Sequence, residues 1–391
     1  MYRYSSRLRW DLPQNSISRA IAAKKTRGER LIDLTVSNPT EVLNNYPHEE
    51  IRRALCQVAD FAYQPDALGH LAAREAVGAY YRARGISVDA GQIVLTASTS
   101  EAYSLLFKLF CDPGDEILIP VPSYPLFEFL AGAESVRAVP YRLVYDGVWC
   151  IDFDDLESRI SEQTRAVVIV SPNNPTGSFL KLRERERLLE LMGDRKIPCI
   201  SDEVFADYCL DRTENAGTSL IGSTGNLSFS FGGLSKSAGM PQMKAAWIII
   251  SGPEDECRSA VSRLELLTDS FLSVGTPVQR TMRELLQIGD EVQQVLQQRI
   301  RTNLDYAKNT LHDTAGSVLR TEGGWSAIIR VPQVCSEEVW VTRLLNEQNV
   351  LVQPGYFFDM RSEAYVVTSL ITIPEIFEQG LERIKVLLTQ C

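Results

Sequence analysis

The sequence contains few histidines and no regular cysteine motif. Its three histidines, His48, His70 and His312, lie far apart in a chain of 391 residues. The spacing of a histidine-based metal site or of a Ser-His-Asp triad is therefore missing, and we predict no metal site. Eight cysteines are scattered without a C-x-x-C pair, which is typical of reduced thiols in the cytoplasm.

Long hydrophobic runs and an excess of positive charge are also absent. The longest apolar stretches, such as residues 245–250, have the length of a strand and fall far short of a membrane span. Residues 1–10 contain three arginines but no apolar run follows them, so we expect no signal peptide. The net charge of −10 argues against a nucleic-acid surface. We expect a cytoplasmic protein that binds neither membranes nor nucleic acid.

What the sequence does contain is an alternation of short apolar runs with amphipathic stretches. Hydrophobic residues make up 45% and charged residues 23%, close to the average for globular proteins. Most of the runs are nearly continuous in apolar or β-branched residues, as expected of strands covered on both faces. The alternation predicts an α/β fold with a mainly parallel central sheet and helices on both faces. The predicted strands are 93–95, 116–120, 166–170, 198–201, 227–231 and 245–250.

The pattern changes in the last third of the chain. From about residue 278 to 312 it is helical for unusually long, which we interpret as a helix that links two domains. Alternating strand-like and helix-like segments follow, which predicts a smaller α+β domain. The predicted parts are an N-terminal arm and small-domain segment (1–47), a large domain (48–285) and a small C-terminal domain (286–391).

Polar clusters follow the predicted strands, at the sheet edge where open α/β sheets bind ligands. Residues 96–101 are rich in Ser and Thr and precede a helix, whose N-terminus suits a phosphate group. Asn174 lies between two prolines and offers a planar amide. Asp202 directly follows an apolar strand, and a buried carboxylate needs a partner. Lys236 lies among small residues after another strand, where desolvation would lower the pKa of its amine and make it a nucleophile.

Each cluster also has an ordinary structural explanation. The Ser and Thr residues can cap a helix, and the proline-rich segment can be a rigid turn. Asp202 can be a surface carboxylate and Lys236 a solvated loop lysine. A phosphate-binding P-loop is excluded, because Ser235 precedes the lysine where glycine is required. The order and spacing of all the clusters are more specific than any one of them.

Together the motifs resemble fold-type-I enzymes that depend on pyridoxal 5′-phosphate (PLP), specifically the class I and II aminotransferases. The resemblance runs from about Leu34 to Leu388. It implies a large PLP-binding domain and ping-pong transfer of an amino group, through pyridoxamine phosphate, between an amino acid donor and a 2-oxo acid acceptor. Its most specific parts are N-P-T-G at 174–177, D-E-V at 202–204, and S-K-x-x-G at 235–239 with a basic residue eight positions after the lysine.

The resemblance assigns roles to residues around the cofactor ring. Lys236, preceded by Ser235, would carry PLP as an imine and move a proton between substrate and cofactor. Asp202 would pair with the ring nitrogen and keep it protonated, so that the ring can accept electrons. Asn174 would donate to the ring oxygen O3′. Tyr124 would stack on the ring, unless it is simply a core aromatic.

Further residues match the family's phosphate site and subunit interface. By this resemblance Ser98, Thr99, Ser100 and Lys244 would bind the phosphate. Tyr63 matches a tyrosine that reaches the phosphate of the neighbouring subunit. The resemblance therefore implies a homodimer with shared active sites.

The chain departs from the family pattern near the ring oxygen and the phosphate. Phe205 stands where a tyrosine usually donates to O3′, which leaves Asn174 as the expected donor, with Tyr208 as a candidate substitute. Lys244 replaces the commoner arginine and supplies a point charge without a bidentate fork. Gly233 stands where a phosphate-contacting serine often occurs.

The departure that bears most on the substrate lies in a C-terminal strand. The family's R-x-S-F motif, whose arginine binds the substrate α-carboxylate, is here V-T-S-L, with Val367 at the arginine's position. Either another cation such as Arg361 or Arg330 binds that carboxylate, or the substrate lacks it or places it elsewhere. Asn38 and Tyr356 are candidates for the substrate pocket, with structural turn residues as the alternative.

The expected activity is that of a transaminase, and two other readings compete with it. A β-elimination lyase or a decarboxylase could use the same cofactor machinery, because function resides in the site and not in the fold. A non-catalytic sensor on the same fold is disfavoured, since Lys236 and Asp202 are both retained and no helix-turn-helix pattern precedes the matched region.

Overall fold

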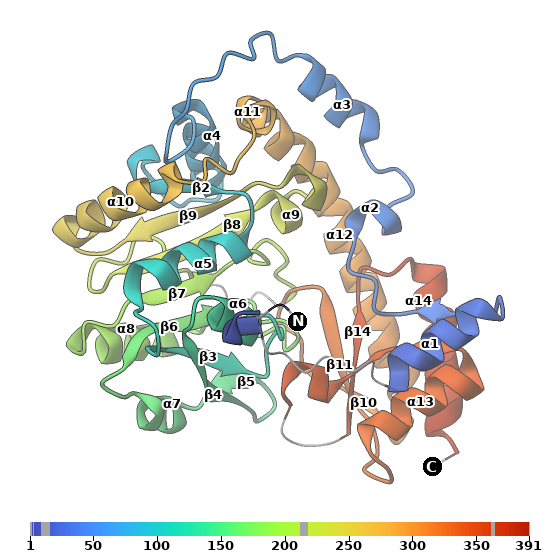
Figure 1. Ribbon diagram of the computed structural model, residues 1–391. Helices are drawn as coiled ribbons and strands as arrows, with labels where there is room; N and C mark the ends of the chain where they lie inside the picture. Colours follow the sequence, from blue (N-terminus) through green and yellow to red (C-terminus); the bar gives the residue numbers. More distant parts are fainter. Residues whose placement is uncertain (1, 3, 9–15, 212–217, 361–363, 391) are drawn as a thin grey trace.

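Eight strands form the central sheet in the computed structural model, which describes residues 2, 4–8, 16–211, 218–360 and 364–390 (Figure 1). The strands are β2 (Ile93–Thr96), β3 (Glu116–Val121), β4 (Arg137–Tyr145), β5 (Trp149–Ile151), β6 (Thr164–Val170), β7 (Cys199–Asp202), β8 (Ser228–Gly233) and β9 (Ala246–Ser251). Their order is β2-β9-β8-β7-β6-β3-β4-β5. The strand β9 pairs antiparallel with β2 and β8, and β5 pairs antiparallel with β4. β9 and β5 therefore run opposite to the other six strands. The predicted mainly parallel sheet is confirmed.

Two strands of this sheet, β4 and β5, are missing from the prediction. In β4 the residues range from exposed to buried, so the sequence there lacks the continuous apolar run that marks the central strands. β5 has three residues, too few for a pattern to emerge. Both lie at one edge of the sheet, where a strand is covered less completely.

Helices cover both faces of the sheet, as predicted (Figure 1). Phe107 and Leu264 bring two helices onto one face, and Leu188 brings a third onto the other. The helices between residues 48 and 280 are α3 (His48–Cys56), α4 (Leu71–Arg82), α5 (Thr99–Phe110), α6 (Phe127–Ala133), α7 (Phe153–Arg159), α8 (Leu182–Asp194), α9 (Leu234–Ser237), α10 (Glu254–Asp269) and α11 (Thr276–Arg280). The 3₁₀ turns are η1 (Ser6–Leu8), η2 (Ala90–Gln92) and η3 (Pro241–Met243).

The long helix expected near 278–312 is α12 (Met282–Leu311), with 30 residues. A smaller antiparallel sheet follows it, in the order β10-β11-β14-β13. The elements after α12 are β10 (Ser317–Val318), β11 (Ser326–Arg330), α13 (Glu337–Gln348), β12 (Val350–Leu351), β13 (Gln353–Pro354), η4 (Gly355–Phe358), β14 (Tyr365–Ser369) and α14 (Pro374–Leu388). Figure 1 shows them grouped beside the large sheet.

The N-terminal segment joins these C-terminal elements. After α1 (Ser16–Thr26), the short strand β1 (Ile32–Asp33) pairs in parallel with β12. Leu34 then packs against Gly380 of α14, and the chain turns through α2 (Pro39–Val42). The expected arm therefore contains a helix and a strand of its own. The domain boundaries at 47 and 285 stay a prediction.

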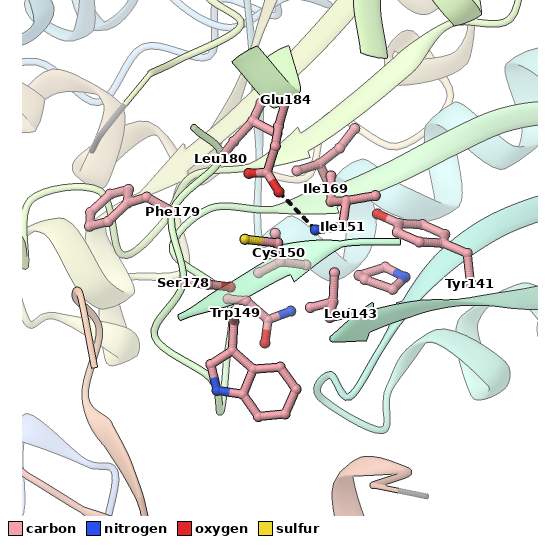
Figure 2. Close-up of a pocket in the computed structure, with 13 residues that line it drawn as sticks. Tyr141, Leu143, Trp149, Cys150, Ile151, Ile169, Ser178, Phe179, Leu180 and Glu184 are labelled. Atoms are coloured by element: carbon pink, nitrogen blue, oxygen red, sulfur yellow. Dashed lines mark hydrogen bonds between the residues drawn. The ribbon is translucent and has the colours of Figure 1, made fainter. Parts of the chain in front are cut away.

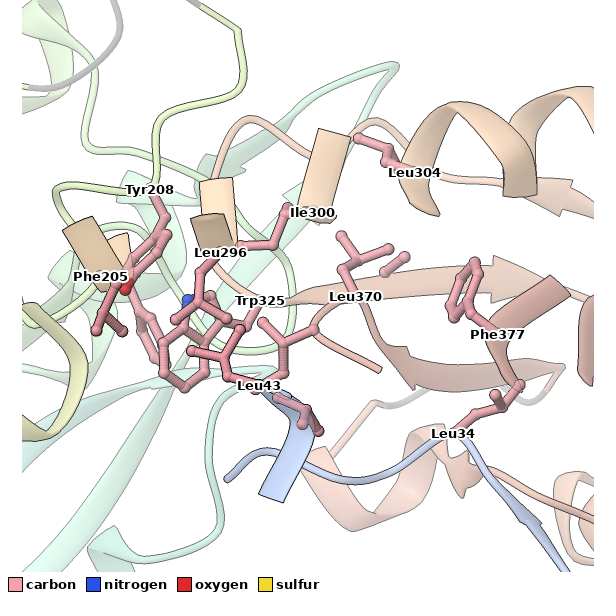
Figure 3. Packing of buried hydrophobic residues seen from close by; sticks show 14 of the residues in the cluster. Leu34, Leu43, Phe205, Tyr208, Leu296, Ile300, Leu304, Trp325, Leu370 and Phe377 are labelled. Atoms are coloured by element: carbon pink, nitrogen blue, oxygen red, sulfur yellow. The ribbon is translucent and has the colours of Figure 1, made fainter. Parts of the chain in front are cut away.

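A continuous apolar core connects the long helix to both groups of elements (Figure 3). Leu296 and Ile300 of α12 belong to the same cluster as Leu370, just after β14. Phe205, in the turn after β7, and Trp325, just before β11, belong to it as well. The turn after β7 is therefore packed against the C-terminal part of the chain.

A small pocket lies beside β4, β5 and α8, near the edge of the sheet that β5 forms (Figure 2). Glu184 accepts a hydrogen bond from the backbone N–H of Ile151 at 2.7 Å, while Tyr141 donates to the carbonyl of Val168 at 2.8 Å. None of the predicted site residues lines this pocket. Within the described ranges, no helix has both the length and the apolar character needed to cross a bilayer.

Candidate active site

A cavity of ≈ 310 Å³ lies between the large sheet and the C-terminal sheet. One wall is made by residues at the carboxyl ends of parallel strands, Asn174 after β6, Asp202 in β7 and Lys236 after β8. The opposite wall includes Ser326 of β11 and Ser369 of β14, which pair with each other. The polar clusters predicted from separate strand ends thus meet in one cavity, as the sheet geometry requires.

Lys236 lies on the one-turn helix α9 that directly follows β8. Its Nζ is 4.7 Å from the ring centre of Trp325 and 5.5 Å from that of Phe205. Burial lowers the pKa of the amine to about 8, although the Asp202 carboxylate opposes this shift. A substantial fraction of the amine is therefore neutral near physiological pH, the form that attacks a carbonyl carbon.

Asp202 is the last residue of β7, and its carboxylate is fixed by two donors. The hydroxyl of Tyr103 donates to Oδ2 at 3.0 Å, and the backbone N–H of Val204 donates to Oδ1 at 3.2 Å. Burial raises the pKa of this carboxyl to about 6, and the two hydrogen bonds oppose the rise. The carboxylate is thus buried, oriented and still ionised at neutral pH.

Asn174 is brought to the cavity by a turn that touches the segment before β11. Gly177 in this turn has a positive φ of 69°, and a Cβ there would lie 2.6 Å from the carbonyl oxygen of Gly323. The hydroxyl of Ser326 donates to Oδ1 of Asn174 at 3.1 Å. Since the amide oxygen is engaged, the NH₂ group remains available to donate to a ligand.

The N-terminus of α5 combines helix capping with a possible anion site. Ser98 is the N-cap residue, and its Oγ accepts from the N–H of Glu101 at 3.2 Å. Thr99 and Ser100 line the cavity. The first N–H groups of a helix have no partner inside it, so this end of the cavity presents donors and the positive end of the helix dipole.

Three of the residues expected to contact the cofactor do not line the cavity. Lys244 follows η3, is exposed and has a left-handed backbone, and Tyr63 is 75% exposed. Neither lines the cavity, and neither does the half-buried Ser235. Tyr124 does line the cavity, and 52% of its surface is exposed. It is therefore not a core aromatic residue.

The two aromatic residues near the lysine have different partners. Phe205 is buried edge-on to Trp325, with 5.2 Å between the ring centres. The hydroxyl of Tyr208 donates to the backbone carbonyl of Lys236 at 2.7 Å. Tyr208 is thus bonded to the backbone of the lysine. It does not line the cavity, whereas Asn174 does.

None of the described residues that were predicted for the substrate lines the cavity. Asn38 caps α2, and its Oδ1 accepts from the N–H of Thr40 at 3.1 Å. Tyr356 packs against Phe357 on η4. Arg330 is exposed with its guanidinium near two tyrosine rings, and Arg361 falls outside the described residues.

Val367, at the position of the family's arginine, is buried in an apolar cluster with Trp149 and Phe358. It shares a face of β14 with Ser369, because side chains alternate along a strand. Ser369 and Phe358 line the cavity, whereas Val367 does not. Of the described lining residues, the one with a basic side chain is Lys236.

Several lining residues were not found from the sequence, namely Thr35, Ser37, Tyr103, Trp325, Ser326, Gln353, Phe358 and Ser369. Tyr103 had a usable signal, since it follows Thr99 by four positions and shares its helix face. The others come from separate segments that packing brings together, and no local motif marks them. Within the described ranges, no group of three or more potential metal ligands is present.

The donor set of this cavity fits PLP. A partly neutral amine can bond an aldehyde carbon, a buried carboxylate can pair with a protonated ring nitrogen, and a free amide NH₂ can donate to a phenolic oxygen. A helix N-terminus can receive the phosphate.

Comparison with known proteins decides the family. The model of the family described as aminotransferase class I and II matches residues 29–371. The chain belongs to this family. Tyrosine aminotransferase from Mus musculus is 27% identical over 377 residues, which cover 93% of this chain and 82% of the relative. Alanine aminotransferase from Mycobacterium tuberculosis is 27% identical over 363 residues, 90% and 84% of the two chains.

Solved structures share the same fold. Alanine aminotransferase from Pyrococcus furiosus has a TM-score of 0.89 at 23% identity and covers all of both chains. Aspartate aminotransferase from Thermotoga maritima has a TM-score of 0.83 at 22% identity, over 98% of this chain and 100% of that one. The aminotransferase is therefore a PLP-dependent enzyme that moves an amino group between an amino acid and a 2-oxo acid. These findings do not support the alternative activities, a lyase or a decarboxylase.

Proposed function

We propose that this aminotransferase attaches PLP through the ε-amine of Lys236, with Asp202 paired to the ring nitrogen. The observation that carries the proposal is that a buried amine of lowered pKa and a buried carboxylate line the same cavity. When bound, PLP supplies an electron-withdrawing ring that stabilises negative charge at the substrate Cα. Once the amino group of the substrate has displaced it from the cofactor, the neutral amine of Lys236 would take the proton from that carbon, because a base with a pKa near the working pH is efficient.

The remaining cofactor contacts follow from the lining of the cavity. We assign the NH₂ group of Asn174 to the ring oxygen and Tyr124 to a face of the ring. The N-terminus of α5, with Ser98, Thr99 and Ser100, would hold the phosphate. Lys244, an exposed lysine after η3, would add a positive charge to this site, and Ser235 would fix the backbone before the catalytic lysine.

We further propose a cytoplasmic homodimer with shared active sites. Phe61 and Tyr63 are 65% and 75% exposed, and neighbouring exposed aromatic side chains favour a protein interface. Tyr63 would reach the phosphate in the site of the partner subunit. The amino donor and the oxo-acid acceptor are small molecules.

The preferred donor, in our proposal, is a neutral amino acid. A second carboxylate, as in aspartate or glutamate, needs a cation to compensate its desolvation. Among the lining residues that are described, Lys236 alone is basic, and the cofactor occupies it. Ser369 and Gln353 line the cavity and can donate to the α-carboxylate. Asn38, Tyr356 and Arg361 are the further substrate contacts that we propose.

Spectroscopy of the purified enzyme tests these assignments. We expect a visible absorbance from the bound cofactor that changes when a neutral amino acid is added without any oxo acid. A lyase would instead restore the starting spectrum and release ammonia. Lys236→Ala should abolish the absorbance, while Lys25→Ala, at an exposed position on α1, should leave it unchanged. A retained spectrum in Lys236→Ala would remove this lysine from its role.

A further inference from the structure

Tyr103 is a buried tyrosine whose hydroxyl reaches the carboxylate of Asp202. It lies on α5, is 3% exposed and donates to Oδ2 at 3.0 Å. Its ring is edge-on to Phe127 and Phe231, at 5.2 and 4.8 Å between ring centres. Because the ring is held on both sides, the hydroxyl has a fixed position, and Tyr103 also lines the cavity.

The direction of the hydrogen bond follows from the acidity of the two groups. Burial and the nearby Asp202 carboxylate raise the pKa of Tyr103 well above its ordinary value, so the phenol remains protonated. It therefore donates, and the carboxylate accepts. Each oxygen of Asp202 then has one protein donor, Tyr103 or the N–H of Val204, and keeps lone pairs free for a ligand.

We propose that Tyr103 is a positioning residue that keeps Asp202 ionised and aimed at the ring nitrogen of PLP. A carboxylate with a single donor on one oxygen can rotate, whereas one held at both oxygens presents a fixed direction. The inference rests on the proposed role of Asp202. It predicts that the benefit of Tyr103 depends on a ring nitrogen being present in the ligand.

Tyr141 provides a matched control. It is 1% exposed, and its hydroxyl makes one hydrogen bond, to the carbonyl of Val168 at 2.8 Å. It lines the pocket of Figure 2 and not the cavity described above. Replacing either tyrosine with phenylalanine removes one buried hydroxyl, but only Tyr103 touches Asp202.

The experiment is a fluorescence titration of the cofactor-free protein with two ligands. One is PLP, and the other is its 1-deaza analogue, in which a C–H group replaces the ring nitrogen. Loss of a hydrogen bond to a charged group should weaken PLP binding by about tenfold in Tyr103→Phe. The same variant should bind the deaza analogue as the wild type does, and Tyr141→Phe should not distinguish the two ligands.

Equal weakening of both ligands in Tyr103→Phe, or no weakening of either, would overturn the positioning role. If the phenylalanine variant fails to fold by circular dichroism, Tyr103→Met allows the same comparison. The Asp202→Asn variant separates this inference from the proposed role of Asp202, on which it rests. If that variant also fails to distinguish the ligands, the role of Asp202 itself is wrong; if it alone distinguishes them, only the role of Tyr103 is wrong.

Discussion

Lys236 and Asp202 are both held in surroundings that disfavour their charges. Burial moves the pKa of the amine down to about 8 and that of the carboxyl up to about 6. Such shifts are useful for catalysis but carry a cost in stability, because each pKa differs from its value in the unfolded chain. For Lys236 the unfolded chain binds more protons between about pH 8 and 10.5. Its contribution to stability therefore improves as the pH rises through that window.

Removing the amine should stabilise the cofactor-free protein at neutral pH. For Lys236→Met we expect a gain of up to about 3 kcal/mol in the free energy of unfolding at pH 7. The gain should shrink as the pH approaches 10.5, where the unfolded lysine is also losing its proton. Urea unfolding at several pH values measures it. A difference that does not vary with pH would show that the amine is not desolvated.

Whether a site residue could be predicted depends on whether a local sequence motif contains it. Asn174, Asp202 and Lys236 each lie at or just after the end of a strand, within a short motif, so the sequence and the geometry of a parallel sheet predict that they converge. Gln353 and Ser369 line the same cavity from β13 and β14, which pair with each other. A single sequence contains no signal for that pairing. The position of Arg361 lies outside the described residues.

At the scale of elements, the helix that bears the lysine depends on α12. Gly289 of α12 lies against Ala238, the C-cap residue of α9, and a Cβ at Gly289 would be 2.4 Å from the Cβ of Ala238. Gln293, one turn further along, donates to the carbonyl of Ser237 at 3.1 Å. The long helix therefore sets the position of Lys236 in the cavity.

Gly289→Ala should accordingly disturb both stability and cofactor binding. Overpacking of this contact should cost about 1–3 kcal/mol in the free energy of unfolding. PLP affinity should fall as well, since α9 must move. Gly225→Ala is a suitable control, because a Cβ there would meet nothing within 4 Å. Thermal unfolding and cofactor titration of both variants provide the comparison, and an unaffected Gly289→Ala would contradict the dependence on α12.

The elements were predicted unevenly from the sequence. The central strands and α12 have strong periodic signals, because their burial is continuous along a strand or along one helix face. The strand β4, next to the edge of the sheet, and the helix α1 have weaker patterns, since they are partly exposed and are stabilised by neighbours distant in sequence. The local hydrophobic pattern predicts a helix or strand well when burial of one of its faces is what stabilises it.

At the scale of the whole molecule, mixed dimers test the sharing of active sites. We expect a heterodimer of Lys236→Ala and Tyr63→Ala subunits to have about half the wild-type activity, because one of its two sites then contains both native residues. Each homodimer should be nearly inactive. Differently tagged subunits allow the heterodimer to be purified and assayed. If Tyr63 acts within its own subunit, the heterodimer will be no more active than the Tyr63→Ala homodimer.

The cavity has walls from nearly the full length of the chain, from Thr35 to Ser369. A chain growing on the ribosome has made the lysine by residue 236, yet it still lacks β11 and β14. Trp325, whose ring centre lies 4.7 Å from the amine, has not yet been made. The wall of the cavity that contains Trp325 and Ser369 is therefore completed only after almost all of the described chain has been made.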